Sequence, residues 1–210
     1  MKEVNSYGWK AVIGSSIGYA MDGFDLLILG FMLTLISGDL GLTTGQAGSL
    51  VTWTLVGAVI GGFIFGTLSD KFGRVRVLTW TIVLFAVFTG LCAFAQGYWD
   101  LLIYRTIAGI GLGGEFGIGM ALAAEAWPAQ HRAKATSYVA IGWQLGVLAA
   151  ALLTPVLLPY IGWRGMFMVG IIPAFVAWIF RAKLHEPEIF VQSKDTKEHS
   201  HTNSFKLLVK

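Results

Sequence analysis

Six long apolar stretches occupy most of this chain of 210 residues, and they limit its fold more than any other feature. They cover roughly residues 9–36, 47–68, 77–95, 101–126, 135–158 and 166–180. A helix that crosses a bilayer needs roughly 20 mainly apolar residues, and short polar turns separate these stretches. We therefore predict an all-α membrane protein with six transmembrane helices.

The composition agrees with a membrane location, because hydrophobic residues make up 55% of the chain and charged residues only 13%. A soluble domain carries about 25% charged residues, so an ordinary cytosolic globule is excluded. The first stretch is too long for a signal peptide and lacks a cleavage site, so we expect it to remain as a helix. Residues 1–182 are predicted to form the membrane domain, and the polar residues 183–210 a cytoplasmic tail or the start of a central linker.

Lysine and arginine gather on one side of the predicted bundle, which fixes its orientation by the positive-inside rule. The opposite side holds Arg164, together with Asp39 and Asp100. Both chain ends are therefore predicted to face the cytoplasm from a multi-pass protein of the cell membrane. This asymmetry accounts for the net charge of +3 without a nucleic-acid partner. The basic side carries Lys2, Lys10, Lys71, Arg74, Arg76, Arg132, Lys134, Arg181 and Lys183.

The end of the second stretch and the charged turn that follows it contain Gly66, Asp70, Gly73 and Arg74. We expect Gly66 to allow close helix contact, Asp70 to hydrogen-bond the following turn, and Gly73 to adopt a left-handed backbone. The run Gly-Thr-Leu-Ser-Asp-Lys-Phe-Gly-Arg-Val-Arg resembles the signature loop of the major facilitator superfamily. The resemblance implies that ion pairs in this loop help to close the cytoplasmic side, and the alternative is a generic charged turn.

A second charged element follows the fourth stretch, where Glu125, Pro128 and Arg132 have the spacing Glu-x-x-Pro-x-x-x-Arg. This spacing resembles an element of sugar and metabolite porters, although Ala133 stands where that element often has glycine. Glu125 is expected to pair with Arg74 or Arg132 and to contribute to gating. The alternative is a solvated helix end.

Two aspartates, Asp22 and Asp25, interrupt the first stretch and share one helical face. A charge inside the bilayer costs at least about 2.5 kcal/mol, so such residues usually face a cavity and serve a function. Two nearby carboxylates in a low dielectric also favour proton uptake by one of them. The run Asp-Gly-Phe-Asp resembles the first-helix motif of aromatic-acid and sialic-acid proton symporters, which implies proton coupling. The alternative is a helix break with two hydrated, structural aspartates.

The fourth stretch contains Arg105 and Glu115, about 15 Å apart along a helix. An arginine within a span recruits a carboxylate from the substrate or from the protein, so Arg105 is predicted to bind substrate and Glu115 to carry protons. A purely internal ion pair is the alternative. Gln144 and Trp143 in the fifth stretch are further candidates for substrate contact, since a buried amide needs a partner.

The glycines of the fourth stretch formally match a dinucleotide-binding fingerprint, but no strand precedes them and their flanks continue the apolar stretch. Gly109, Gly113 and Gly117 are instead predicted to form a small-residue face for helix packing. Further pairs with this spacing are Gly14 and Gly18, Gly57 and Gly61, and Gly142 and Gly146. No catalytic constellation is visible, so an enzyme is not expected. The single cysteine is expected to be a packing residue, and no metal site or cofactor is expected.

Similar turns at Gly73 and Gly162, placed on opposite membrane faces, suggest an inverted repeat of three plus three helices. The chain thus resembles the N-terminal half of a major facilitator transporter, closest to the metabolite–proton symporters. The resemblance implies symport of a small organic acid or sugar acid by alternating access, driven by the proton gradient. A second half is required, either a further C-terminal segment or another copy. The alternatives are a proton-independent sugar or metabolite facilitator and a non-transporting sensor or remnant.

Overall fold

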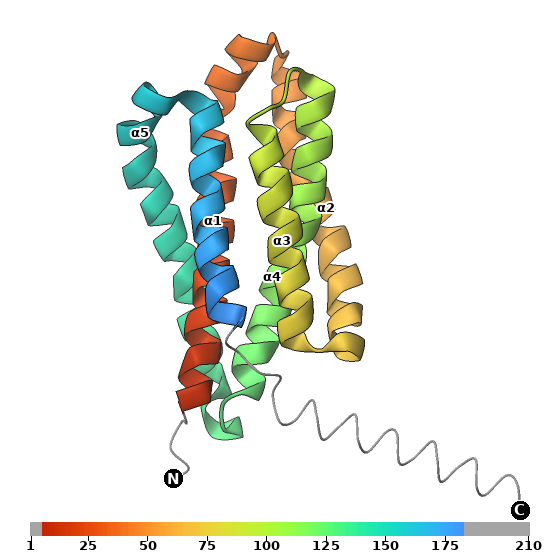
Figure 1. Cartoon of the computed structure of the whole chain (residues 1–210), viewed down its shortest axis with the longest axis vertical. Helices are drawn as coiled ribbons and strands as arrows, with labels where there is room; N and C mark the ends of the chain where they lie inside the picture. Colours follow the sequence, from red (N-terminus) through yellow and green to blue (C-terminus); the bar gives the residue numbers. More distant parts are fainter. Residues whose placement is uncertain (1–5, 183–210) are drawn as a thin grey trace, which may run out of the picture.

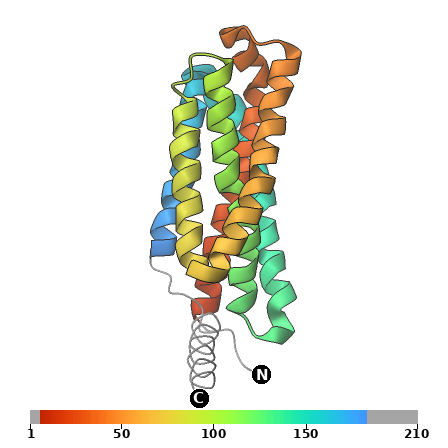
Figure 2. The ribbon, with the colours of Figure 1, turned by 90° about the vertical axis from the view of Figure 1, so that its right-hand side faces the viewer.

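The computed structural model describes residues 6–182, which form long helices lying side by side (Figures 1 and 2). The predicted tail at 183–210 lies outside the described residues. The elements are α1 (Ser6–Leu40), α2 (Thr44–Phe72), α3 (Arg74–Cys92), α4 (Tyr98–Glu125), the short 3-10 helix η1 (Ala129–His131) and α5 (Arg132–Ala182).

The helices are longer and the turns shorter than the apolar stretches predicted. The connection expected at 38–44 shrinks to three residues, because α1 continues to Leu40 and α2 begins after Thr43. Thr43 closes a capping box with Gln46: its hydroxyl accepts from the Gln46 amide at 3.3 Å, and its own amide donates to Gln46 Oε1 at 2.9 Å. Reciprocal capping satisfies two amides that a helix start leaves unpaired.

Five helices among the described residues are long and apolar enough to cross a membrane. The sixth predicted span lies inside α5, whose helical backbone is interrupted at Gly162 with φ 64° and ψ 179°. The chain reverses direction there, and the teal and blue parts of α5 run as two antiparallel segments (Figure 1). The count of six spans and the inverted repeat remain predictions.

The turns divide the bundle into two ends (Figure 1). We call the end with the α1–α2 turn, the α3–α4 turn and Gly162 the far end. The near end holds the start of α1, the α2–α3 turn at Gly73 and η1. Both glycines have positive φ, at 106° for Gly73 and 64° for Gly162, and side-chain-bearing residues rarely adopt such angles.

Glycine lets two pairs of helices approach to backbone contact. A Cβ placed on Gly61 of α2 would lie 1.9 Å from the carbonyl oxygen of Ile110 in α4. One placed on Gly146 of α5 would lie 1.8 Å from the carbonyl oxygen of Ala20 in α1. The packing role predicted for these glycines is therefore confirmed at the α2–α4 and α1–α5 contacts, as expected for helices that pack in lipid.

The predicted glycine face on α4 is shorter than expected. Gly109 and Gly113 meet the carbonyl oxygens of Thr54 and Ala58, whereas nothing lies within 4 Å of a Cβ placed on Gly117. The prediction for Gly117 is therefore wrong. The spacing Gly-xxx-Gly-xxx-Gly continues along α4, but α2 is in contact with only the first two glycines.

The outer surface of the bundle is strongly apolar, as in Phe63 and Tyr160, whose exposed fractions are 83% and 86%. The buried polar side chains lie inside, and α1 and α4 contribute half of them. The hydrocarbon core of a bilayer offers no hydrogen-bond partners, so charged groups inside a membrane bundle must find partners within the protein. The buried polar residues are Ser15, Asp22, Asp25, Thr54, Ser69, Thr81, Thr89, Arg105, Glu115 and Thr154.

We predict that Gly113→Ala lowers the free energy of unfolding by about 1–3 kcal/mol, the usual cost of overpacking. The new methyl group would lie 1.7 Å from the carbonyl oxygen of Ala58 and would push α2 and α4 apart. Denaturant unfolding in detergent micelles measures this loss.

The matched control is Gly117→Ala, one turn further along the same helix. It meets open space, and we expect no loss or a gain of up to about 1 kcal/mol from the lower backbone entropy of alanine. An equal loss in both variants would contradict the packing assignment.

Candidate functional site

A buried ion pair between α1 and α4 is the centre of the candidate site. Arg105 Nη1 donates to Asp25 Oδ1 at 3.0 Å, and Nη2 donates to Oδ2 at 2.6 Å. Their side chains are 0% and 1% exposed. The Arg105 guanidinium carbon also lies 5.7 Å from the centre of the Phe167 ring. Two parallel charge-assisted hydrogen bonds give the pair both strength and a defined orientation.

This pair shows how two sequence-predicted residues come together. Arg105 was expected to meet a carboxylate from the substrate or from the protein, and in this structure the carboxylate is that of Asp25. The two residues are 80 positions apart in the chain, so sequence spacing alone gave no sign of the pairing.

Two further carboxylates are buried in the same bundle. Asp22 is 0% exposed and precedes Asp25 by three residues on α1. Glu115 of α4 is 3% exposed, and its Oε2 accepts a hydrogen bond from the Thr81 hydroxyl of α3 at 3.3 Å. The alternative of hydrated aspartates at a helix break is wrong here, because α1 is continuous through both aspartates and the bundle buries their side chains.

The other two predicted substrate residues lie on α5. The Trp143 ring centre is 5.0 Å from that of Tyr19, and its backbone carbonyl lies against Gly23 of α1. Gln144 is exposed, so the reason given for choosing it, a buried amide in need of a partner, does not hold. The central ion pair is built without either residue.

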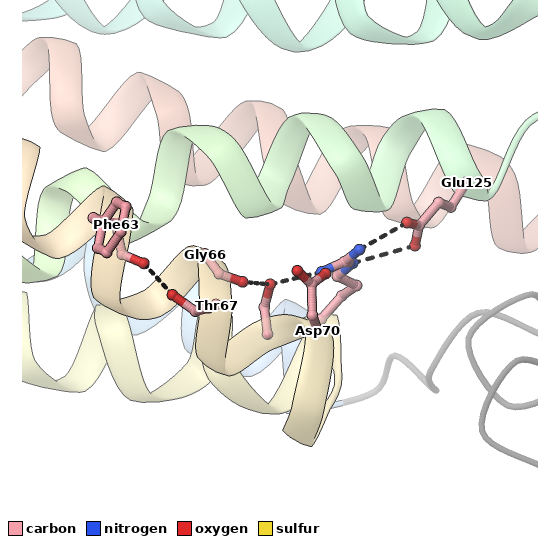
Figure 3. A network of polar contacts seen from close by, with 7 residues as sticks. Phe63, Gly66, Thr67, Asp70 and Glu125 are labelled. Atoms are coloured by element: carbon pink, nitrogen blue, oxygen red, sulfur yellow. Dashed lines mark hydrogen bonds and ion pairs between the residues drawn. The ribbon is translucent and has the colours of Figure 1, made fainter. Parts of the chain in front are cut away.

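The near end carries a charged cluster around Arg74 (Figure 3). Arg74 Nη2 and Nε donate to the two Glu125 carboxylate oxygens at 3.1 and 3.4 Å, and Nη1 donates to the Ser69 hydroxyl at 2.7 Å. Arg74 also pairs with Asp70 of α2. The cluster therefore joins the α2–α3 turn to the last residue of α4.

Two predictions are decided at this cluster. Of the two candidate partners of Glu125, Arg74 forms the ion pair, and Arg132 is exposed at the start of α5. Gly66 does not mediate close helix contact, because nothing lies within 4 Å of a Cβ placed on it. Its carbonyl instead accepts from Ser69 at 2.7 Å, so the residue contributes its backbone to the network.

The far end carries a second charged cluster, which the sequence did not predict. Asp39 Oδ2 accepts from Trp163 Nε1 at 3.1 Å and from Arg164 Nη1 at 2.5 Å. Arg164 Nη2 also donates to the carbonyl of Ala95 at 3.2 Å. Sequence reasoning used Asp39 and Arg164 only for membrane orientation. Their opposite charges at one predicted face were the available signal.

Within residues 6–182, no group of three or more histidine, cysteine, aspartate or glutamate side chains is placed to hold a metal ion. The described site offers ion pairs that join helices, and carboxylates buried within the bundle.

Comparison with known proteins agrees with this architecture. The family model of the Major Facilitator Superfamily matches residues 15–210. A candidate metabolite transport protein of Haemophilus influenzae is 76% identical over 99% of this chain and 52% of its own length. The sialic acid transporter NanX of Escherichia coli is 33% identical over 92% of this chain and 48% of its own length.

A further relative is the cis,cis-muconate transport protein of Acinetobacter baylyi, 33% identical over 98% of this chain and 51% of its own length. The chain spans about half the length of the curated relatives it matches. Among solved structures, a partially occluded inward-open form of the xylose transporter XylE from E. coli superposes with a TM-score of 0.81 at 23% identity. That match covers 97% of this chain and 54% of XylE, and it shows likeness of fold.

We predict that Arg105→Met and Asp25→Leu each lower the free energy of unfolding by about 3–5 kcal/mol, because each leaves one buried charge without its partner. The double variant should lose less than either single variant, since no isolated charge remains. Denaturant unfolding in mixed micelles measures all three. Losses that simply add in the double variant would show that the two residues are not coupled.

At the near end we predict that Glu125→Gln costs about 1–2 kcal/mol of unfolding free energy, because it weakens two partly buried charge-assisted hydrogen bonds. Asp70→Asn is the matched control, since it removes the other carboxylate of Arg74. Its side chain is 67% exposed, against 24% for Glu125, so its loss should stay within about 0.5 kcal/mol. The reverse order of losses would overturn this ranking.

Proposed function

The chain belongs to the major facilitator superfamily, and from that premise we propose that it is the N-terminal six-helix half of a proton-coupled symporter for small organic acids. The single observation that carries the proposal is the Arg105–Asp25 pair, fully enclosed between α1 and α4. A buried ion pair is a costly way to stabilise a protein, because desolvation offsets much of the attraction. Charged groups at this depth are typical of ion and substrate pathways.

The pair supports a mechanism in which the substrate anion replaces Asp25 as the partner of Arg105. An anionic substrate that reaches Arg105 competes with Asp25 for the same two guanidinium donors. Once Asp25 has lost its cation, its charged form is strongly disfavoured in the low dielectric, so it binds a proton. Substrate and proton therefore enter together, and Asp25 releases the proton when it pairs with Arg105 again.

Asp22 and Glu115 extend this proton chemistry. Both are buried carboxylates, and Glu115 accepts a hydrogen bond from the Thr81 hydroxyl of α3. In the proposed cycle they exchange protons between the central pair and the membrane faces. Trp143 and Gln144 on α5 are candidates for substrate contact once a second half covers that surface.

The near-end cluster is the proposed gate on the cytoplasmic side. Arg74 holds the α2–α3 turn to the end of α4 through Glu125, so this end of the half moves as one unit. The distribution of lysine and arginine supports placing the near end, and both chain ends, in the cytoplasm. Arg132 adds positive charge at the same face.

Alternating access requires a second six-helix half, with substrate bound at the interface between the halves. The length of the relatives supports this, because the chain covers about half of each. The relatives described as carrying sialic acid and cis,cis-muconate support an acidic substrate. The break of α5 at Gly162 supports the sixth span.

We predict that an inward proton gradient drives uptake of a labelled organic acid into proteoliposomes and that Asp25→Asn removes this dependence. Coupling between two ligands typically amounts to about 5–150-fold, so the ratio of uptake with and without the gradient should fall at least about fivefold. The chain of 210 residues is assayed beside a version that carries a second six-helix half.

Asp100→Asn is the matched control, because it removes a carboxylate at the far end and leaves the central pair intact. Asp25→Asn that keeps full gradient dependence would refute proton coupling through this residue and favour a facilitator. No flux of any acid or sugar from either version, despite correct insertion, would favour a non-transporting protein.

A further inference from the structure

The far-end cluster of Asp39, Trp163 and Arg164 ties together three parts of the bundle. Asp39 is the penultimate residue of α1, and Trp163 and Arg164 directly follow the break in α5 at Gly162. Arg164 also reaches the carbonyl of Ala95, in the turn after α3. Its guanidinium carbon lies 4.1 Å from the centre of the Trp163 ring, so stacking and hydrogen bonding hold it together.

The far-end cluster has the same construction as the near-end cluster. At the near end, Arg74 follows a positive-φ glycine, Gly73, and binds the carboxylate of Glu125 at the end of α4. At the far end, Arg164 follows the positive-φ Gly162 by two residues and binds a carboxylate at the end of α1. At each end of the bundle, an arginine that follows a positive-φ glycine thus pairs with a carboxylate at the end of another helix.

The ion pair of the far-end cluster can open at a small cost in free energy. The Asp39 and Arg164 side chains are 47% and 45% exposed, and an exposed pair contributes little net stability. Beside it lies a hollow of about 650 Å³ with Leu35, Leu158, Pro159 and Ile161 in its lining. Arg164 is therefore partly exposed and borders a space into which its side chain can swing.

A buried contact chain connects this cluster to the central ion pair. Trp163 is only 5% exposed, and its ring meets that of Phe167 edge to face, with centres 6.0 Å apart. Phe167 is fully buried, and its ring centre lies 5.7 Å from the guanidinium carbon of Arg105. Asp39 and Asp25 are therefore joined through Trp163, Phe167 and Arg105.

We propose that Asp39, Trp163 and Arg164 form a latch that holds the far end closed and that Phe167 connects the latch to Arg105. This inference rests on the proposed transport function. When Arg105 leaves Asp25, the Phe167 ring loses its charged neighbour and can shift. A shift of Phe167 weakens its edge-to-face contact with Trp163, and the latch loosens. Trp163 and Phe167 are positioning residues in this scheme, since neither needs to touch the substrate.

The chain contains its own reporter for the test. Cys92 is the single cysteine in the sequence and is 0% exposed at the end of α3. It belongs to the same apolar cluster as Trp163 and Phe167, three residues before Ala95. A water-soluble maleimide can reach Cys92 only when this part of the bundle opens, so its rate of labelling reports the latch.

The labelling rate is measured in lipid nanodiscs, where both faces meet water. We expect Arg164→Gln and Asp39→Asn to speed labelling by about fivefold, the upper end of what an exposed pair contributes. Arg164→Lys, which keeps the charge, should return most of the protection. Asp100→Asn, a charge loss at the same end outside the cluster, should leave the rate unchanged, and Cys92→Ser gives the blank.

The link through Phe167 has its own test, a double-mutant cycle. Phe167→Leu should speed labelling by itself, and in combination with Arg164→Gln it should add little, because both act on one latch. If the two increases in labelling rate multiply in the double variant, the link through Phe167 is overturned.

Unchanged labelling in both latch variants, or an equal rise in Asp100→Asn, would overturn the latch itself. Labelling needs neither substrate nor gradient, so these outcomes are independent of the uptake assay. Absent uptake with a working latch would count against the proposed function, and normal uptake with an unresponsive Cys92 would count against the latch.

Discussion

The burial of Arg105 against Asp25 is the interaction on which the arrangement of α1 and α4 depends. Neither lipid nor water can solvate the two charges at this position, so each requires the other at hydrogen-bonding distance. This requirement fixes the position of α1 relative to α4 along the helix axes. The glycine contacts of α1 with α5 and of α4 with α2 then set the positions of the flanking helices.

The charged clusters at the two ends differ from the central pair in exposure and therefore in energetic role. The central pair of Arg105 and Asp25 is inaccessible to solvent, and breaking it without a replacement partner costs much free energy. The end clusters are more exposed, the Arg164–Asp39 pair more than the Arg74–Glu125 pair, so water can more readily replace a partner when a pair opens. A bundle with a buried ion pair at its centre and more exposed pairs at its ends can open at one end while its core stays packed, which suits the alternating access that we propose.

Several sequence-based expectations were confirmed because they depend on local chemistry. The positive φ of Gly73 follows from a turn between two helices, and small residues at helical spacing made the close approach at Gly61, Gly113 and Gly146 possible. Expectations that depended on what lies opposite a residue were less secure. Gly117 continues the spacing of Gly113 but meets no helix, and Gly66 meets open space.

The sequence by itself determined that this chain is a helical membrane protein, because the lengths of its apolar stretches are a local property, and its turn motifs carried the resemblance to the major facilitator superfamily. Only the tertiary structure decided the partners of its charges. Asp25 with Arg105, Glu125 with Arg74, and Asp39 with Arg164 are separated by 80, 51 and 125 positions. Such pairs form because helices must pack around groups that lipid cannot solvate, and the order of helices in space is absent from any local pattern.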